Sequence, residues 1–180
     1  MSKTTWKIDE LHSDVQFKIK HLVISTVTGS FTKFSAEAET NGDEFEGGKI
    51  NFSADVNSIS TGNEQRDGHL KSPDFFDTAN YPTMDFISTK VEKSPDGYRL
   101  YGNLTMRGVT KPVTLNAEFG GTAKDPYGNF KAGFEVNGKI NRSEFGLTWG
   151  AVTEAGGMVV SDEVKIAANV QMMKVVPATA

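Results

Sequence analysis

The stretch Val164-Lys165-Ile166-Ala167-Ala168-Asn169-Val170-Gln171-Met172 decides the fold of this chain. Its even positions are apolar, and Lys165, Asn169 and Gln171 between them are polar. Such alternation is typical of a β-strand with one buried face and one solvated face. The same pattern recurs in residues 15–19, 50–56, 100–106, 113–119 and 130–136. The sequence therefore predicts an all-β chain whose apolar faces meet between two sheets or inside a closed barrel.

Turn signals separate the alternating segments, and connections this short join antiparallel neighbours. We assign turns to Asn41-Gly42, Gly47-Gly48, Pro95-Asp96-Gly97, Gly120-Gly121, Pro126-Tyr127-Gly128 and Gly156-Gly157. Four glycines lie inside the expected strands: Gly29, Gly102, Gly133 and Gly138. They favour a tightly curved sheet, so we expect a barrel of about eight strands rather than a sandwich. The inward phase changes near Lys33, which predicts a β-bulge there.

Composition limits the classes of protein to which the chain can belong. Its 180 residues fit one domain, residues 1–180, and the net charge of −4 comes from scattered acidic and basic residues. Without a basic stripe, nucleic acid is not an expected partner. The absence of cysteine excludes disulfides and thiolate metal sites, and no apolar stretch is long enough for a membrane segment. No signal segment follows Met1, which predicts a cytoplasmic protein as written, or a periplasmic one if an export signal was trimmed.

Two segments interrupt the alternation. Residues 61–82 predict a short helix that Thr61 or Asn63 caps and Pro73 stops, forming a lid or plug on the barrel. Residues 141–147 follow a strand and predict a second helical turn. The chain is therefore expected to carry one or two short helices.

Ordered motifs along nearly the whole chain resemble the YceI-like, or polyisoprenoid-binding, family. Each motif alone is weakly specific, whereas the ordered set is specific. The motifs are Trp6-Lys-Ile-Asp9 with His12-Ser13, Val15-Gln-Phe17, Gly29-Ser-Phe31, Ser58-Ile-Ser-Thr61, Arg66-Asp67, His69-Leu70, Asp74-Phe-Phe-Asp77 before Tyr81-Pro82, Gly102-Asn-Leu104-Thr-Met-Arg-Gly108-Val-Thr-Lys-Pro112-Val, and Asn141-Arg142 with Phe145-Gly146.

The resemblance implies a lipocalin-like antiparallel barrel that holds a long apolar ligand. The expected ligand is a polyisoprenoid, an isoprenoid quinone precursor or a fatty-acyl amide, bound for sequestration or transport. The family is known for binding without an established chemistry, so the resemblance implies no cofactor and no enzymatic activity. Many relatives carry an export signal, and the chain as given is expected to depart from them in this respect.

The inward faces of a closed barrel would supply the ligand site. Pattern alone leaves a filled and a hollow interior open, and the resemblance favours the hollow one. The candidate lumen residues are Phe17, Ile19, Phe31, Phe52, Val56, Leu70, Phe75, Phe76, Met84, Phe86, Leu104, Met106, Leu115, Phe134 and Ile140. Phenylalanine and methionine side chains adapt to apolar guests of irregular shape. We therefore expect tolerance among isoprenoid and acyl tails of similar length.

Four polar residues are candidates for a head-group contact or for a structural role. Arg66 or His69 could meet an oxygen of the ligand at the barrel mouth. Alternatively, Arg66 and Asp67 pair with each other or cap local backbone groups, and we favour this interpretation. For Arg142 the two interpretations have equal support.

Other residues with reactive side chains do not predict a catalytic or metal site. Asp9, His12, Ser13 and Asp14 are close in sequence, but alternate residues of a strand point to opposite faces, so no triad is expected. His12, His21 and His69 do not have metal-ligand spacing. We expect Trp6 to close one end of the barrel, and Trp149 to close or line another part.

Two rival functions remain. A lipid-modifying enzyme could use the same cavity, with His69 as its titrating group. A scaffold or stress-response protein could instead pair through an edge strand and form a homodimer.

Overall fold

The computed structural model describes residues 3–21, 24–147 and 160–175. They form a sheet whose strands are β1 (Lys3–Ile8), β2 (Asp14–His21), β3 (Ser25–Phe31), β4 (Phe34–Asn41), β5 (Glu44–Asp55), β6 (Ile59–Ser60), β7 (Thr83–Ser94), β8 (Gly97–Met106), β9 (Val109–Lys124), β10 (Phe130–Asn141) and β11 (Val160–Lys174). Helix α1 spans Glu64–Lys71, and 3-10 turns lie at η1 (Glu10–His12), η2 (Val56–Ser58) and η3 (Arg142–Phe145). These helices are too short to cross a membrane.

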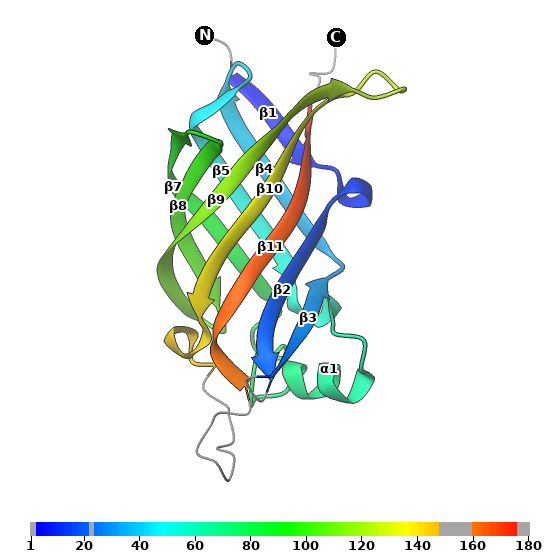
Figure 1. The fold of residues 1–180 in the computed structure, drawn as a ribbon, viewed down its shortest axis with the longest axis vertical. Coiled ribbons are helices and arrows are strands. Elements are labelled where there is room, and N and C mark those ends of the chain that lie inside the picture. Colours follow the sequence, from blue (N-terminus) through cyan, green and yellow to red (C-terminus); the bar gives the residue numbers. More distant parts are fainter. Residues whose placement is uncertain (1–2, 22–23, 148–159, 176–180) are drawn as a thin grey trace.

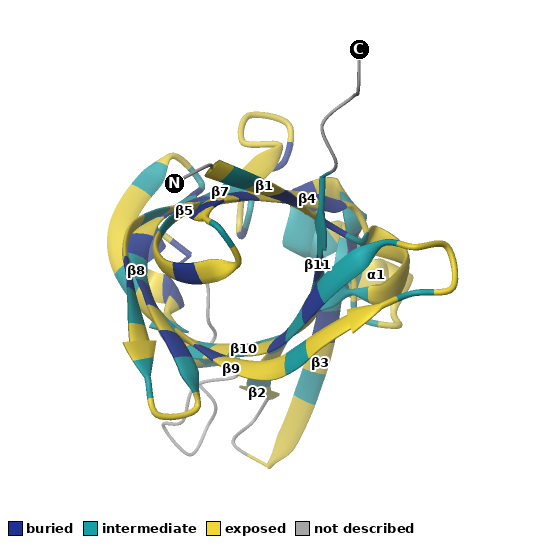
Figure 2. Cartoon of the chain, turned by 90° about the horizontal axis from the view of Figure 1, so that it is seen from above, coloured by how far each residue is buried: buried dark blue, intermediate teal, exposed yellow. Residues whose placement is uncertain are grey.

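Strand β11 closes the sheet into a barrel. One edge of β11 pairs with β10, and its other edge pairs first with β2 and then with β1. Strands β1 and β2 thus share one position around the barrel, with η1 between them. Strands β3 and β4 share the next position, and β6 continues β5 after η2. The eleven strands therefore occupy eight positions, all antiparallel, and Figure 2 shows the resulting ring. The predicted barrel is confirmed.

The change of phase near Lys33 is a break between two strands rather than a bulge. Strand β3 ends at Phe31 and β4 begins at Phe34. Between them, Thr32 and Lys33 turn toward η2, where the Lys33 amide donates to Ser58 Oγ over 3.0 Å. The predicted bulge is wrong because Thr32 and Lys33 belong to neither strand, and the Lys33 amide bonds to Ser58 of η2 instead of to a neighbouring strand.

Two predicted turns are also wrong. Gly47-Gly48 lies inside β5 and Gly120-Gly121 inside β9. Both pairs lie where the pairing register with the neighbouring strand shifts. Each strand therefore has one or more residues there without a partner across the sheet, which form a β-bulge, and the strand continues past them. The predicted turn at Gly156-Gly157 lies outside the described residues.

Both interruptions contain helical structure, as predicted. Asn63 caps α1, since its Oδ1 accepts a hydrogen bond from the Arg66 amide at 3.0 Å. The helix ends at Lys71, and its C-cap Ser72 stands directly before Pro73. Turn η3 ends at Gly146, whose φ of 77° is in the left-handed region that glycine favours. Helix α1 lies at the end of the barrel away from the chain termini (Figure 1).

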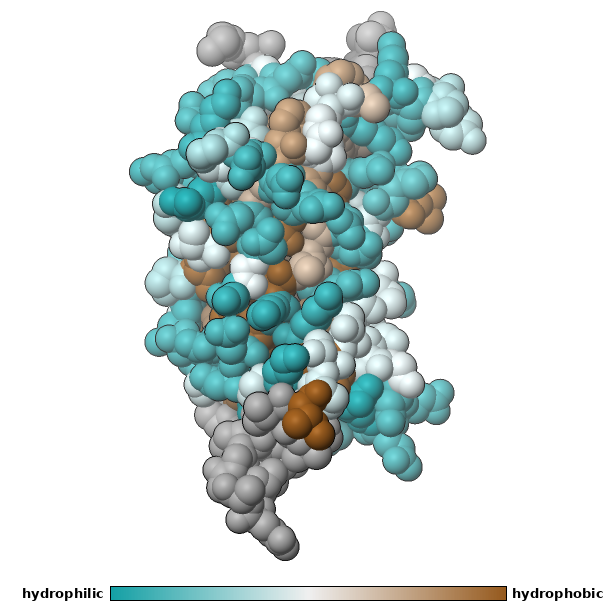
Figure 3. Space-filling model, in the orientation of Figure 1, coloured by the Kyte–Doolittle hydropathy of each residue, from teal (hydrophilic) through white to brown (hydrophobic). Residues whose placement is uncertain are grey.

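The buried hydrophobic residues form one core cluster inside the barrel. On the face shown in Figure 3, most of the outer surface is hydrophilic. Near the termini, Trp6 is fully buried and its indole N–H donates to Thr40 Oγ1 over 2.8 Å. Its ring packs against Phe45 and Phe130. This end is therefore packed with aromatic rings, and Trp6 lies where closure was expected, whereas Trp149 is outside the described residues.

Candidate ligand-binding cavity

A cavity of about 590 Å³ occupies the barrel interior. Its lining is almost entirely apolar, and its volume lies in the usual range of small-molecule sites. On β8 alone, Tyr98 and Met106 both line it, and the eight residue steps between them correspond to roughly 27 Å along a strand. The cavity is therefore long as well as apolar.

Most of the candidate lumen residues line this cavity. Phe17 and Ile19 come from β2, Phe31 from β3, Phe52 from β5, Met84 and Phe86 from β7, Leu104 and Met106 from β8, Leu115 from β9 and Phe134 from β10. Leu70 of α1 and the following Phe75 and Phe76 add apolar surface at the end of the barrel where α1 lies. Strand β11 supplies a complete inward row: Val164, Ile166, Ala168, Val170 and Met172.

Val56 and Ile140 are the exceptions. Val56 is 1% exposed but does not line the cavity, because β5 ends at Asp55 and η2 turns Val56 into the solid core. Ile140 is half-buried near the end of β10 and packs against the core. Next to it, Arg142 and Leu147 provide the cavity lining instead. Alternation alone therefore included Val56 and Ile140 among the cavity-lining positions, where the structure does not place them.

Glycines under large side chains help to keep the centre of the barrel open. A Cβ atom on Gly29 would overlap the ring of Phe17, its partner on the neighbouring strand. A Cβ on Gly102 would lie 2.5 Å from the Ile87 carbonyl oxygen and 2.6 Å from Phe86 Cζ, and one on Gly138 would lie 2.5 Å from Leu115 Cδ2. Because these side chains use the space above a glycine, they lie along the wall rather than across the bore.

The end of the cavity near the termini is aromatic. Phe45, Tyr98 and Phe134 line it there. The Tyr98 hydroxyl donates to Glu44 Oε1 over 2.5 Å, and burial together with this carboxylate raises the pKa of Tyr98 to about 12. Sequence reasoning missed Phe45 and Tyr98, although Tyr98 continues the alternation of Leu100 and Leu104 by one more step.

The opposite end is more polar and is formed largely by α1 and the residues before it. Thr61, Asn63, Gln65, Arg66 and His69 line the cavity there. Arg66 donates from Nε to Thr61 Oγ1 and from Nη2 to the Thr61 carbonyl oxygen, both over 2.7 Å. This mouth is where a polar head group could meet the protein.

Asp67 and His69 fasten the segment that carries the mouth. Asp67 Oδ1 accepts from the Thr61 amide at 2.9 Å and from the Thr61 hydroxyl at 2.6 Å, and Asp67 does not line the cavity. His69 Nε2 lies 2.9 Å from Asp74 Oδ2, and its ring meets Phe75 edge-on. Arg66 and Asp67 thus do not pair with each other, but both bind Thr61.

Arg142 lies between the cavity and the backbone of the adjacent segment. Its side chain is buried, with Nε donating to the Ser161 carbonyl over 2.9 Å and Nη1 to the Leu147 carbonyl over 2.7 Å. Burial lowers the pKa of the guanidinium, and nearby Asp162 opposes this change. Arg142 therefore combines a structural role with a place in the cavity lining.

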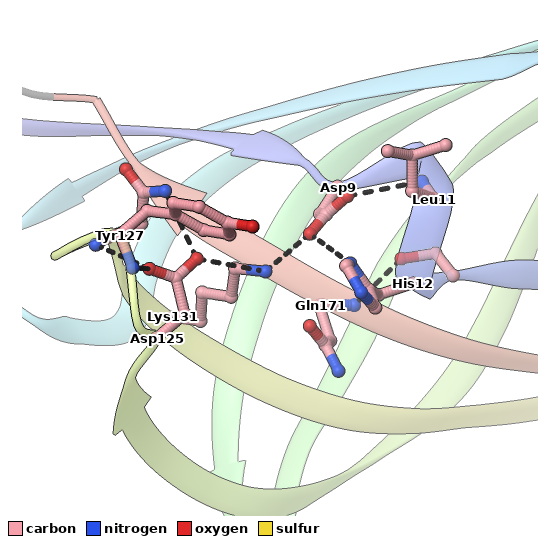
Figure 4. A network of polar contacts seen from close by, with 9 residues as sticks. Asp9, Leu11, His12, Asp125, Tyr127, Lys131 and Gln171 are labelled. Atoms are coloured by element: carbon pink, nitrogen blue, oxygen red, sulfur yellow. Dashed lines mark hydrogen bonds and ion pairs between the residues drawn. The ribbon is translucent and has the colours of Figure 1, made fainter.

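A separate polar network joins η1 to the β9–β10 hairpin (Figure 4). Lys131 Nζ donates to Asp9 Oδ2 over 2.5 Å and lies 3.5 Å from Asp125 Oδ2, while His12 Nδ1 lies 2.7 Å from Asp9 Oδ2. Partial burial acts to raise the pKa of Asp9, but the hydrogen bonds with Lys131 and His12 outweigh it, so this pKa is lowered. Ser13 Oγ instead accepts from the Gln171 amide. Asp9 and His12 thus belong to one structural network, and Ser13 makes a separate backbone contact.

Comparison with known proteins places this barrel among related chains. Residues 6–172 match the family model described as a YceI-like domain. A UPF0312 protein of Yersinia pestis (strain Pestoides F) is 38% identical over 172 residues, which cover 94% of this chain and 86% of that relative.

Two solved structures have the same fold. The Campylobacter jejuni YceI protein is 37% identical with a TM-score of 0.72, covering 87% of this chain and 90% of that one. A polyisoprenoid binding domain from Saccharophagus degradans has a TM-score of 0.62 at 17% identity, covering 93% and 97%. At that identity the second likeness shows the fold alone.

Proposed function

The chain belongs to the YceI-like family, and from this premise we propose that it binds one long apolar lipid inside the barrel, to sequester or carry it. The ligand class is a polyisoprenoid or isoprenoid quinone precursor first, and a fatty-acyl amide second. The long apolar cavity of about 590 Å³ is the observation that supports this proposal most strongly.

Burial of the hydrocarbon tail supplies the binding free energy. Each methylene transferred from water into the cavity contributes about 0.8 kcal/mol. A few isoprene units therefore offset the several kcal/mol that a ligand loses on being immobilised. Strong polar contacts are not required, so the site selects for length and shape of the tail more than for its chemical identity.

The head group of the ligand lies at the mouth in this proposal. Gln65 and Asn63 offer amide groups there, and Arg66 places its guanidinium at the same opening. Since Arg66 already donates two hydrogen bonds to Thr61, a neutral or weakly polar head group suits this mouth better than one that needs a dedicated cation. Quinone and amide oxygens have this chemistry.

The binding is non-catalytic in this proposal. His69, the residue that a lipid-modifying enzyme would use, is engaged with Asp74 and Phe75 at the mouth. Turnover of a bound lipid that disappears in His69→Ala while binding persists would favour the enzyme instead. The cytoplasmic location and the homodimer stay predictions from the sequence.

Lipid extraction after purification without detergent tests the proposal. We expect mass spectrometry to find one isoprenoid or acyl lipid in near-stoichiometric amount. An empty protein that is folded and takes up neither farnesol nor a fatty-acyl amide would contradict it.

A further inference from the structure

We propose that Phe45, Tyr98 and Phe134 form a fixed end wall, which sets the longest apolar chain that gains affinity from the cavity. This inference rests on the proposed function and adds the residues that determine its specificity for chain length. The three side chains come from β5, β8 and β10, so they converge from separate parts of the barrel.

The three rings are packed together. The ring centroids of Phe45 and Phe134 are 5.0 Å apart in a T-shaped arrangement, and Tyr98 lies 6.0 Å from Phe45 and 6.1 Å from Phe134. Each ring contacts the other two at distances favourable for aromatic pairs. All three residues line the cavity, yet each is at most 9% exposed. A chain that enters from the mouth meets this cluster at the far end.

Two further rings form a second layer behind the end wall: Trp6, which is fully buried, and Phe119, which is 40% exposed. Trp6 packs at 4.9 Å from Phe45, and Phe119 packs at 5.5 Å from Phe134 and 6.3 Å from Tyr98. Neither Trp6 nor Phe119 lines the cavity. The apolar space therefore ends at the first layer, and a longer chain finds no continuation beyond it.

One ring in each layer is anchored by a hydrogen bond, and the phenylalanine rings are held by packing against it. The Tyr98 hydroxyl donates to Glu44, the residue directly before Phe45. The start of β5 therefore supplies Phe45 to the wall and also binds Tyr98. In the second layer, the Trp6 indole donates to Thr40. A ring that swings away to admit a longer chain would have to break such a bond or empty a packed site. This cost makes the wall a stop rather than a flexible lining.

The two ends of the cavity should therefore affect long ligands differently. Each added methylene that finds a buried place raises affinity roughly fourfold. Once the tail reaches the end wall, further methylenes remain at the mouth beside α1, which has no fully buried residue. Affinity should then rise with chain length up to a breakpoint and level off beyond it.

The test compares breakpoints in wild type and Phe134→Ala. The probes are farnesol, geranylgeraniol and longer all-trans polyprenols, which displace a fluorescent fatty acid from the purified full chain. We expect Phe134→Ala to move the breakpoint by at least one isoprene unit and to raise affinity for the first longer probe by about tenfold or more. Phe134→Leu, which removes less packing, should move it in the same direction and serves if the alanine variant does not fold.

Two variants provide controls. Tyr127→Ala removes an exposed ring from the turn between β9 and β10 without touching the cavity or either aromatic layer, so its breakpoint should equal that of wild type. Phe52→Ala widens the side of the cavity, and should weaken all probes without moving the breakpoint. If probes bind but the breakpoint stays unchanged in both folded Phe134 variants, the end wall is overturned and lipid binding stands. If wild type binds no probe of any length, both are overturned.

Discussion

The ring of Phe17 on β2 occupies the space above Gly29, its registered partner on β3. A side chain at Gly29 would push that ring toward the centre of the barrel. Phe86 uses Gly102 and Leu115 uses Gly138 in a similar manner. A barrel with this many inward Phe, Leu and Met residues can thus remain hollow, because its glycines let large side chains lie against the wall.

Gly29→Ala should therefore reduce both stability and ligand affinity. The three atoms nearest to the added methyl all belong to the Phe17 ring, and overpacking of this kind typically costs about 1–3 kcal/mol of unfolding free energy. The displaced ring should also lower affinity for polyprenol probes. Urea unfolding and probe displacement measure the two effects.

Gly133→Ala is the matched control, because a Cβ there has no neighbour within 4 Å. Phe17→Leu in the Gly29→Ala background should recover part of the lost stability. Equal effects of Gly29→Ala and Gly133→Ala would show that the Phe17–Gly29 contact does not matter.

Leu104→Arg should block the cavity. Leu104 is buried on β8 and points into the lumen, so a charge there is unpaired and costs about 3 kcal/mol or more of unfolding free energy. Uptake of a fluorescent fatty acid should fall at least tenfold. Asn103→Arg places the same charge on the exposed face of the same strand, where both quantities should hardly change. Unchanged uptake in a folded Leu104→Arg protein would place the ligand elsewhere.

Asp67→Ala and Gln65→Ala should separate structural from ligand contacts at the mouth. Asp67 accepts two hydrogen bonds from Thr61, so its loss should cost about 1–2 kcal/mol and speed amide exchange in α1. Gln65 faces the cavity and is exposed, so its loss should weaken amide or quinone ligands without affecting stability. Amide hydrogen exchange and ligand titration report on the two effects. A larger loss of affinity in Asp67→Ala, with normal exchange in α1, would reverse these assignments.

Asp9→Asn should lower stability near neutral pH and lose its effect in acid. The pKa of Asp9 in the folded chain lies below its usual 3.8, so the carboxylate contributes stability above that value. This contribution disappears as pH falls through the lowered folded pKa. We expect a loss of about 1–2 kcal/mol at pH 7, measured by urea unfolding across pH. Glu10→Gln, at an exposed neighbour, should show no such dependence, and a pH-independent effect of Asp9→Asn would contradict the role of its charge.

Local pattern was enough to predict the strands and much of the cavity, because inward and outward positions alternate along most of each strand. It failed where the chain leaves the sheet without a change in composition. Val56 continues the alternation of Phe52 but lies in η2, and the shift near Lys33 marks a strand break. Residues on either side of such a break contact partners far away in sequence. The local alternation of apolar and polar residues cannot identify those partners.

The aromatic end was hidden for a related reason. Phe45 stands in odd phase, whereas Ile50 and Phe52 stand in even phase, because β5 bulges at Gly47-Gly48. Alternation counted back from Phe52 therefore excludes Phe45. Glycine pairs that mark bulges as well as turns were the available signal.

The most direct test is an experimental density map of the barrel interior in protein purified without detergent. We predict an elongated non-protein feature that starts near Gln65 at the mouth and ends against Phe45, Tyr98 and Phe134. A bore closed by its own side chains, with the rings of Phe17, Phe52 and Phe86 meeting at the centre and no space for a hydrocarbon chain, would contradict lipid binding inside this barrel.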